Sequence, residues 1–369
     1  MLNSIEYAKN SNDPSVLDHV HKMAHKEWVS RGPDECFEEL PTLCASLDAR
    51  MRIAASRVMP LVDIHARASN EYVLEFETAH GVATPSNWAF SQACREVGAP
   101  AGFLRKLTAP LAAECFNHMR EKQPKDLMVK PYLHLLDEGP RLAGLTGPDY
   151  GRIYDAEVGG LATRFVEMNR NFYNPKDWSG KGSGLFASDH DVFIFLIDGG
   201  SMLDVGPRAK FNTGVIFKNS EVGKSKMEIW KFRFNEVCGN LFIWNPSNVS
   251  MLGIRHTSGG PAKFFREGWP TLSDMMATDQ SDLRDAVKLA IEHRIGDTVE
   301  EWVEKFKSKG FTKPEIVNAH AYAEKEEPDT ATLWSAVQGF TALARDMEHA
   351  DTRFDLAQRA AKLVEGLRN

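Results

Sequence analysis

Hydrophobic and polar positions alternate most regularly between residues 213 and 256. Short runs rich in Val, Ile, Phe and Trp are separated there by polar and glycine-containing breaks, which is typical of consecutive strands and turns. Between 230 and 234, three aromatic side chains fall on one face of the expected strand, and Lys231 and Arg233 fall on the other. The pattern therefore predicts a sheet with one apolar face and one basic face.

Similar patterns place further elements before this stretch. The run 191–197 is uniformly apolar, which indicates a strand buried on both faces. Ser86 is a suitable N-cap for a helix that ends before Gly98. Further strands are expected at 72–76 and 141–145, and an amphipathic helix at 149–169.

The chain ends are expected to be helical. Residues 1–70 are predicted to form a helical arm, and residues 271–369 carry almost no strand signal. The second helical region is expected to break at 295–297 and to restart after a cap at Thr312. Three parts follow: an arm (1–70), an α+β core with the basic strands (71–270), and a C-terminal helical subdomain (271–369).

These elements predict an α+β fold. We expect one central, mostly antiparallel sheet built from 140–145 and 184–257, with helices packed on one face. The C-terminal helices form a separate subdomain in this prediction.

Positive charge is concentrated in one part of the chain. The 369 residues carry a formal net charge of −7, yet residues 201–270 hold ten basic against five acidic side chains. Basic residues on strands can contact phosphates. The sequence therefore predicts a nucleic-acid interface made of nine residues: Arg208, Lys210, Lys218, Lys224, Lys226, Lys231, Arg233, Arg255 and His256.

A tight turn is expected at the tip of the basic strands. Asn219 and Ser220 can bond to nearby backbone, and Gly223 permits a positive φ. Lysines flank this turn at 218, 224 and 226. The tip either contacts a phosphate backbone or is simply solvated.

Candidate catalytic groups are few. Asp189, His190 and Asp191 form the densest titratable triplet, but neighbours in a strand point to opposite faces and cannot share a metal ion. His256 follows a strand, where a hydrogen bond or a phosphate contact suits it better than a role as general base. We expect no catalytic residues, no metal and no cofactor.

Composition indicates a cytoplasmic protein. No run of about 18 apolar residues is present, so no membrane span is expected. The first residues lack an export signal, and the five cysteines include no Cys-x-x-Cys pair.

Several motifs, in order, resemble a phage- and plasmid-encoded family known as domain of unknown function 932. They are WAFSQACREVGAPAGFLRKL, RLAGLTGPDYGRIYDAEV, FKNSEVG, EVCGNL, IRHTSG and TLWSAVQGFTALARDMEH. The resemblance covers roughly 85–350, and it implies a structural motif of Asn219, Ser220, Gly223 and Asn240. It implies a bacterial host cell but no activity.

Taken together, these features predict a phage or plasmid DNA-metabolism protein that binds single-stranded DNA, with an annealing recombinase as the specific hypothesis. Annealing recombinases share an antiparallel sheet backed by helices and form rings, so a homo-oligomer is expected. The alternative is a protein-binding anti-defence or host-takeover factor that does not bind DNA. A third hypothesis, a metal-dependent nuclease, would depend on Asp189, Asp191 or His256.

Overall fold

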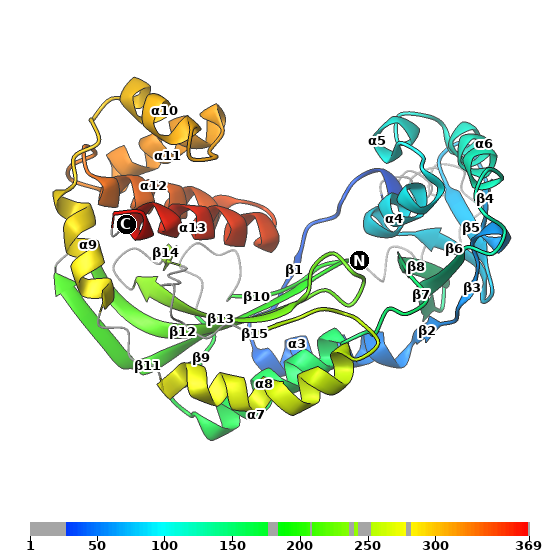
Figure 1. The fold of residues 1–369 in the computed structure, drawn as a ribbon, viewed down its shortest axis with the longest axis horizontal. Coiled ribbons are helices and arrows are strands. Elements are labelled where there is room, and N and C mark those ends of the chain that lie inside the picture. The colour runs from blue at the N-terminus through cyan, green and yellow to red at the C-terminus, as the bar shows by residue number, and fades with distance from the viewer. Residues whose placement is uncertain are drawn as a thin grey trace, which may run out of the picture.

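The computed structural model describes residues 27–175, 184–206, 209–235, 240–242, 252–277 and 282–367. In this part of the chain the strands form two separate sheets, each with its own helices (Figure 1). We call them the large lobe, around an eight-stranded sheet, and the small lobe, around a seven-stranded one. The predicted α+β class is confirmed.

The large sheet is antiparallel at every pairing between its described strands. Its order is β1 (Glu35–Cys36), β10 (Leu185–Ala187), β11 (Val192–Gly206), β12 (Ala209–Asn219), β13 (Met227–Asn235) and β14 (Asn240–Phe242). Two short strands lie off this path: β15 (Leu252–Ile254) pairs with β13, and β9 (Phe172–Tyr173) pairs with β11.

Helices cover both faces of the large sheet, not one as predicted. One face, which includes Phe195 and Phe232, packs against the C-terminal helices: α9 (Asp282–Glu292), α10 (Val299–Lys307), α11 (Lys313–Glu326), α12 (Leu333–Asp346) and α13 (Ala350–Glu365). The other face, which includes Ile194 and Ile229, packs against α3 (Leu40–Arg52), α7 (Asp155–Met168) and α8 (Gly260–Ala277). Figure 1 shows the sheet between these two layers. The central strands β12 and β13 are therefore buried on both faces.

The small sheet contains the strand predicted at 141–145, which was wrongly assigned to the central sheet. Its order is β2 (Ala54–Ser56), β7 (Met128–Leu136), β8 (Gly139–Thr146), β6 (Gly81–Pro85), β5 (Leu74–Thr78) and β4 (His65–Ala68), with β3 (Met59–Pro60) paired to β7. The β6–β8 pairing is parallel, so the sheet is mixed. A 3-10 turn, η1 (Leu61–Asp63), and three helices complete the lobe: α4 (Asn87–Val97), α5 (Ala101–Leu104) and α6 (Ala109–Arg120).

Local signals account for several helix ends. The Ser86 hydroxyl accepts a hydrogen bond from the Ala89 amide at 3.1 Å, which confirms it as the N-cap of α4. Thr312 caps α11 as predicted, and Gly296 has a φ of +97° in the expected break between α9 and α10. Residue 70 lies in the turn between β4 and β5, and residue 270 lies inside α8.

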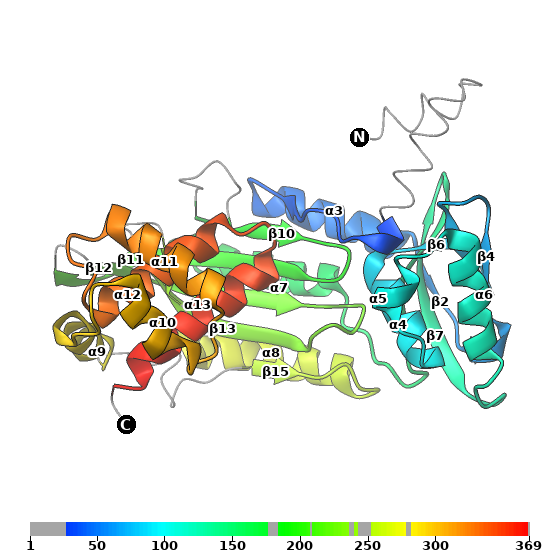
Figure 2. The same ribbon diagram turned by 90° about the horizontal axis from the view of Figure 1, so that it is seen from above.

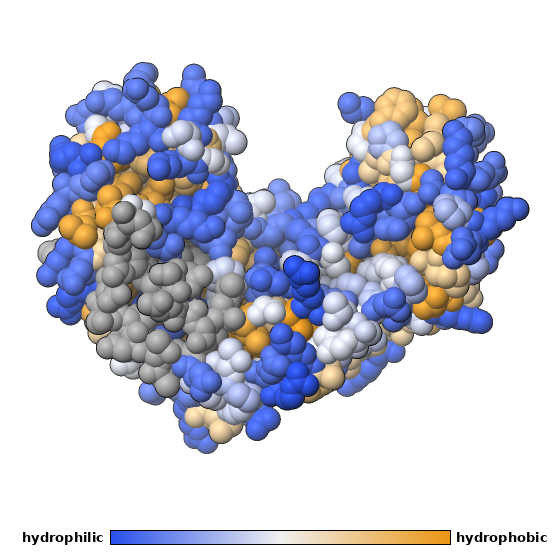
Figure 3. Space-filling view, viewed as in Figure 1, coloured by the Kyte–Doolittle hydropathy of each residue, from blue (hydrophilic) through white to orange (hydrophobic). Residues whose placement is uncertain are grey.

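The two lobes flank an open notch. Figure 3 shows this hollow between the C-terminal helices and the small lobe, and Figure 2 shows the lobes side by side from above. Among the described residues, none of the helices is both long and apolar enough to cross a membrane.

Candidate functional site

The turn between β12 and β13 lies at the junction of the two lobes. Gly223 has a φ of +85° and its amide bonds the Ser220 carbonyl at 3.2 Å, so the predicted tight turn is confirmed. The turn is not a solvated tip, however. Trp88 and Gln92 of α4 both donate to the Val222 carbonyl, at 3.2 and 2.7 Å. The turn therefore fastens the large lobe to the small one.

Asn219 has a structural role at the base of this turn. Its side-chain amide donates to the Ile153 carbonyl at 2.9 Å and to the Asp155 carboxyl at 2.7 Å, and it is fully buried. Of Asn240, which the resemblance also singled out, the structure describes only its place in β14.

Lys224 is held in a network of ionic groups. Its ammonium lies 2.6 Å from His190 Nε2 and 3.1 Å from an Asp191 oxygen, and it also bonds Asp351 at the start of α13. Arg31 pairs with Asp351 at 2.7 Å from the other side. Burial alone would raise the pKa of Asp351, but hydrogen bonds from Lys224 and Arg31 hold it well below its usual value. Lys224 therefore joins three distant segments.

His190, Asp191 and Asp351 bring three ligand-type atoms within 4.8 Å of one another. The expectation that neighbours 189–191 point apart was wrong, because 188–191 form a turn closed by a bond from the Ser188 amide to the Asp191 carbonyl. The Lys224 ammonium bonds all three groups. The cluster thus contains its own cation, and a metal ion would have to displace it.

Most of the other predicted phosphate contacts are paired or buried. Lys218 pairs with Glu228 at 3.4 Å, and Lys210 lies 3.8 Å from Asp204. Lys231 and Arg233 are only 5% and 7% exposed. The prediction of an open basic sheet face was therefore wrong, because the face that carries them is covered.

The remaining predicted residues lie apart from one another. Lys226 is exposed but pairs with Glu228 at 3.2 Å, and Arg255 is exposed. His256 is buried and stacked on Tyr150, with ring centroids 5.0 Å apart. Burial lowers the pKa of His256 to about 4, so it is neutral and has no charge to offer a phosphate. Arg208 lies outside the described residues.

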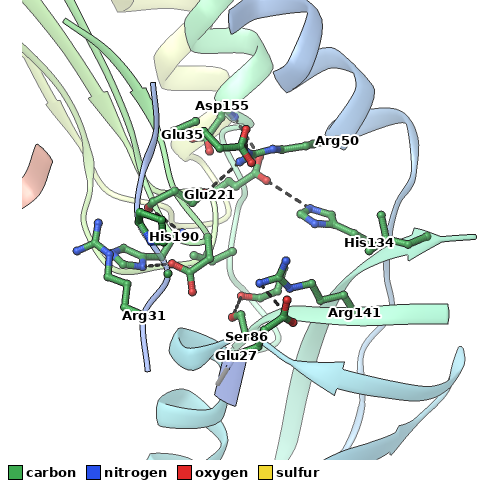
Figure 4. Close-up of a pocket in the computed structure, with 18 of the residues that line it drawn as sticks. Glu27, Arg31, Glu35, Arg50, Ser86, His134, Arg141, Asp155, His190 and Glu221 are labelled. Carbon is green, nitrogen blue, oxygen red and sulfur yellow. Dashed lines mark hydrogen bonds and ion pairs between the residues drawn. The ribbon is translucent and has the colours of Figure 1, made fainter. Parts of the chain in front are cut away.

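A cavity of about 540 Å³ lies beside the β12–β13 turn, between the lobes (Figure 4). Each lobe and the segment leading into β1 contribute to its wall. We call it the interlobe cavity. Its polar lining consists of Glu27, Ser30, Arg31, Glu35, Arg50, Ser86, His134, Arg141, Asp155, Ser188, Asp189, His190 and Glu221.

Two buried carboxyl groups form one side of the interlobe cavity. Glu221 accepts a hydrogen bond from the Tyr132 hydroxyl and another from the Asp155 amide, both at 3.0 Å. Burial, and then the charge of Glu221, raise the pKa of Asp155 well above its ordinary value. Burial beside Glu221 therefore disfavours the charged form of Asp155.

His134 faces this pair from β7. Its Nε2 atom lies 3.9 Å from a Glu221 oxygen (Figure 4), and no described residue forms a hydrogen bond with it. Burial, and then the charge of Arg50, lower the pKa of His134 to about 4. The ring is therefore neutral at pH 7 and can either donate or accept one hydrogen bond at that atom.

Two arginines lie closer to solvent. Arg50 pairs with Glu35 at 3.0 Å, and Arg141 lies 3.8 Å from Glu27. The carboxylate partners are 60% and 46% exposed. Ion pairs with such exposed partners contribute at most about 1 kcal/mol, so a ligand anion can compete with them.

A different surface combines exposed aromatic and basic side chains. On α8, Phe265 is 67% exposed and its neighbours Lys263 and Arg266 are exposed too. Trp269, one turn further on, is half-buried beneath the Arg164 guanidinium of α7, which lies 4.6 Å from the ring centroid. We call Arg164, Lys263, Phe265, Arg266 and Trp269 the α8 strip.

Comparisons with family models, curated proteins and solved structures find no match for this chain. The resemblance to domain of unknown function 932 therefore stays a prediction.

Sequence patterns did not reveal the interlobe cavity. Its groups come from segments as distant as 27 and 222, and no local spacing marks them. The α8 strip carried a signal that was available: two aromatic residues at i and i+4, beside basic ones, in a helix with a separate apolar face.

Proposed function

We propose that the protein binds single-stranded DNA through the α8 strip. The observation that carries the proposal is the exposure of Phe265 between Lys263 and Arg266. An exposed aromatic ring offers a base a stacking surface of any sequence, and flanking cations attract phosphates. Glu267 pairs with Lys263 at 3.6 Å and with Arg266 at 2.8 Å, and a DNA phosphate competes with these exposed ion pairs.

Only some of the basic residues predicted on the strands are available to contact DNA. Lys226 and Arg255 are exposed and add positive charge to the large lobe, whereas Lys224 is held in its ionic network. Replacing Lys224 with Glu would disturb the lobe junction, so it is not a clean test of DNA binding. Variants at Lys263, Phe265 and Arg266 avoid this problem, because these three side chains are exposed.

The direct test is fluorescence anisotropy of a labelled 30-mer, single- and double-stranded, at two salt concentrations. Phe265→Ala should weaken single-strand binding by about 1–3 kcal/mol, the contribution of one stacked base. The matched control is Phe103→Ala, because Phe103 is a 56% exposed aromatic residue on the small lobe. An equal loss in both variants would place the interface elsewhere.

Salt dependence tests the phosphate contacts separately. Lys263→Gln combined with Arg266→Gln should reduce the slope of log affinity against log salt by roughly 1.4, since each single-strand phosphate contact contributes about 0.7. An unchanged slope would contradict a role for these cations.

Annealing and oligomerisation belong to the same proposal. Annealing requires two strands to be held together, which a ring or filament of subunits achieves by repeating one strip. Light scattering on the same sample, with and without DNA, measures the subunit number, and complementary labelled strands measure annealing. Failure to bind either DNA form at low salt would reject the proposal and favour the protein-binding alternative.

A further inference from the structure

The interlobe cavity has the size and chemistry of a ligand site that is independent of the α8 strip. Its volume of about 540 Å³ lies within the range of roughly 300–1,000 Å³ typical of small-molecule sites. It also lies where two lobes meet, a common place for such sites. The charges and hydrogen-bonding groups of its lining indicate which class of ligand it binds.

Charge excludes two classes of ligand. Arg31, Arg50 and Arg141 line the cavity and disfavour a ligand that is cationic throughout. Asp189 and Glu221 disfavour one that is anionic throughout. A ligand that suits both sets has an anionic end and an uncharged end that donates hydrogen bonds.

The anionic end fits the two arginines near solvent. Arg50 and Arg141 present planar guanidinium groups, which bind phosphate oxygens in pairs. Their side chains are only 23% and 32% exposed, so the surrounding structure holds them in place, while their partners Glu35 and Glu27 are freer. A phosphate can bind either guanidinium group by displacing the exposed carboxylate that pairs with it.

The uncharged end fits the buried groups. The Glu221 oxygens already accept from Tyr132 and from the Asp155 amide, and each oxygen has a further lone pair. The Asp155 carboxyl, whose charged form burial disfavours, adds a further hydrogen-bonding group. So does the Nε2 atom of His134, which has no hydrogen-bond partner among the described residues. Amino and hydroxyl groups of a base or a sugar would satisfy these acceptors.

We infer that the interlobe cavity binds a phosphomonoester with a hydrogen-bonding head, of the size of a nucleoside monophosphate. The phosphate lies at Arg50 and Arg141, and the head lies against Glu221, Asp155 and His134. Two sources share this chemistry: a free mononucleotide and the 5′-phosphorylated end of a DNA strand.

Isothermal titration of the full chain tests this inference. The probes are the common nucleoside 5′-monophosphates, the corresponding nucleosides, a hexose 6-phosphate and inorganic phosphate. Binding of at least one monophosphate, tighter than that of its nucleoside and of inorganic phosphate, is the expected result. Binding by none of the monophosphates at millimolar concentration would overturn the inference.

Variants locate the site. Arg141→Gln should weaken monophosphate binding by about tenfold or more, the loss expected for one charge-assisted hydrogen bond. The matched control is Arg67→Gln, a 47% exposed arginine on β4 of the same lobe, which should leave binding unchanged. Arg50→Gln provides a second variant should Arg141→Gln unfold, as judged by its thermal midpoint. Monophosphate binding that is equal in the arginine variants and the wild type would also overturn the assignment.

A last comparison separates the two sources and the two proposals. A 5′-phosphorylated oligonucleotide that competes with the mononucleotide, where its unphosphorylated form does not, identifies a strand end as the ligand. Phe265→Ala should reduce single-strand affinity and leave mononucleotide binding intact. Loss of both activities in Phe265→Ala would show that the cavity is not an independent site.

Discussion

Lys224 is the residue whose role changes most between sequence and structure. Its ammonium lies between the carboxylates of Asp191 and Asp351, which are 2% and 20% exposed. Lys224→Ala would remove the closest cation from Asp191 and leave Arg31, 3.8 Å from Asp191 and 2.7 Å from Asp351, to balance both carboxylates. We expect a loss of about 1–3 kcal/mol in the free energy of unfolding, less than for a fully buried pair because Lys224 is 24% exposed. Urea denaturation measures it.

Lys226 provides the control for that prediction. It lies two positions further along the same turn, is 41% exposed and pairs with Glu228. Lys226→Ala should change stability by less than about 0.5 kcal/mol. Equal effects of the two substitutions would show that the network around Lys224 contributes nothing beyond an exposed ion pair.

Asp155 gives the protein a pH dependence of opposite sign to that of an ordinary paired carboxylate. Its pKa is raised, so its contribution to stability is complete below the unfolded value, near 4, and is lost as pH rises to the folded value. Relative to Asp155→Asn, the wild type should lose up to about 1.4 kcal/mol per pH unit from pH 4 upward. Urea denaturation of both proteins between pH 3.5 and 7 measures the difference. Parallel curves would mean that Asp155 is ionised in the folded state.

The roles of single residues could be predicted from the sequence where they depend on neighbouring positions. The cap at Ser86 and the positive φ at Gly223 depend on neighbours a few positions away, and both were predictable. The ionic partner of Lys224 on α13 is 127 positions away, and nothing in a local pattern indicates it. For the same reason, the hydrogen bond between Glu221 and Tyr132, which are 89 positions apart in the sequence, could not be predicted.

At the scale of elements, close contact between α11 and α12 depends on one glycine. A Cβ atom added to Gly339 would lie 2.2 Å from the Ala319 carbonyl oxygen. Gly339→Ala should therefore force the helices apart and cost about 1–3 kcal/mol, as overpacking does. Gly160→Ala on α7 is the control, because nothing lies within 4 Å of its added Cβ. There we expect a gain of about 0.5–1 kcal/mol from helix propensity, so thermal midpoints that shift in the same direction would contradict the packing argument.

Strands of the large sheet were predictable because they are long and apolar. The expected alternation between Trp230 and Lys231 is real, but alternation does not reveal what covers the second face. The small sheet was missed as a separate unit for another reason. β7 contains Pro131, which weakens its strand signal, and the parallel β6–β8 pairing joins segments more than 50 residues apart.

At the scale of the whole molecule, the lobes are connected through buried polar contacts as well as apolar ones. Gln92 is 2% exposed; it accepts a hydrogen bond from the Leu145 amide at 2.8 Å and donates to the Val222 carbonyl at 2.7 Å. The β12–β13 turn thus depends on a side chain of the opposite lobe. If the lobes moved relative to each other, either the hydrogen bonds of Gln92 would break or the turn would have to move together with α4.

Gln92→Ala should loosen this connection without removing either core. The change leaves the buried Leu145 amide without its partner, which costs about 1–3 kcal/mol. Amide hydrogen exchange should rise at Gly223 and Lys224, whose amides are protected by bonds to Ser220 within the turn. Gln123→Ala is the control, because Gln123 bonds only within the small lobe in the described contacts, to the carbonyls of Val97 and Met119. If exchange at the turn stays unchanged in Gln92→Ala, the lobes are held together by their other contacts and the turn does not depend on Gln92.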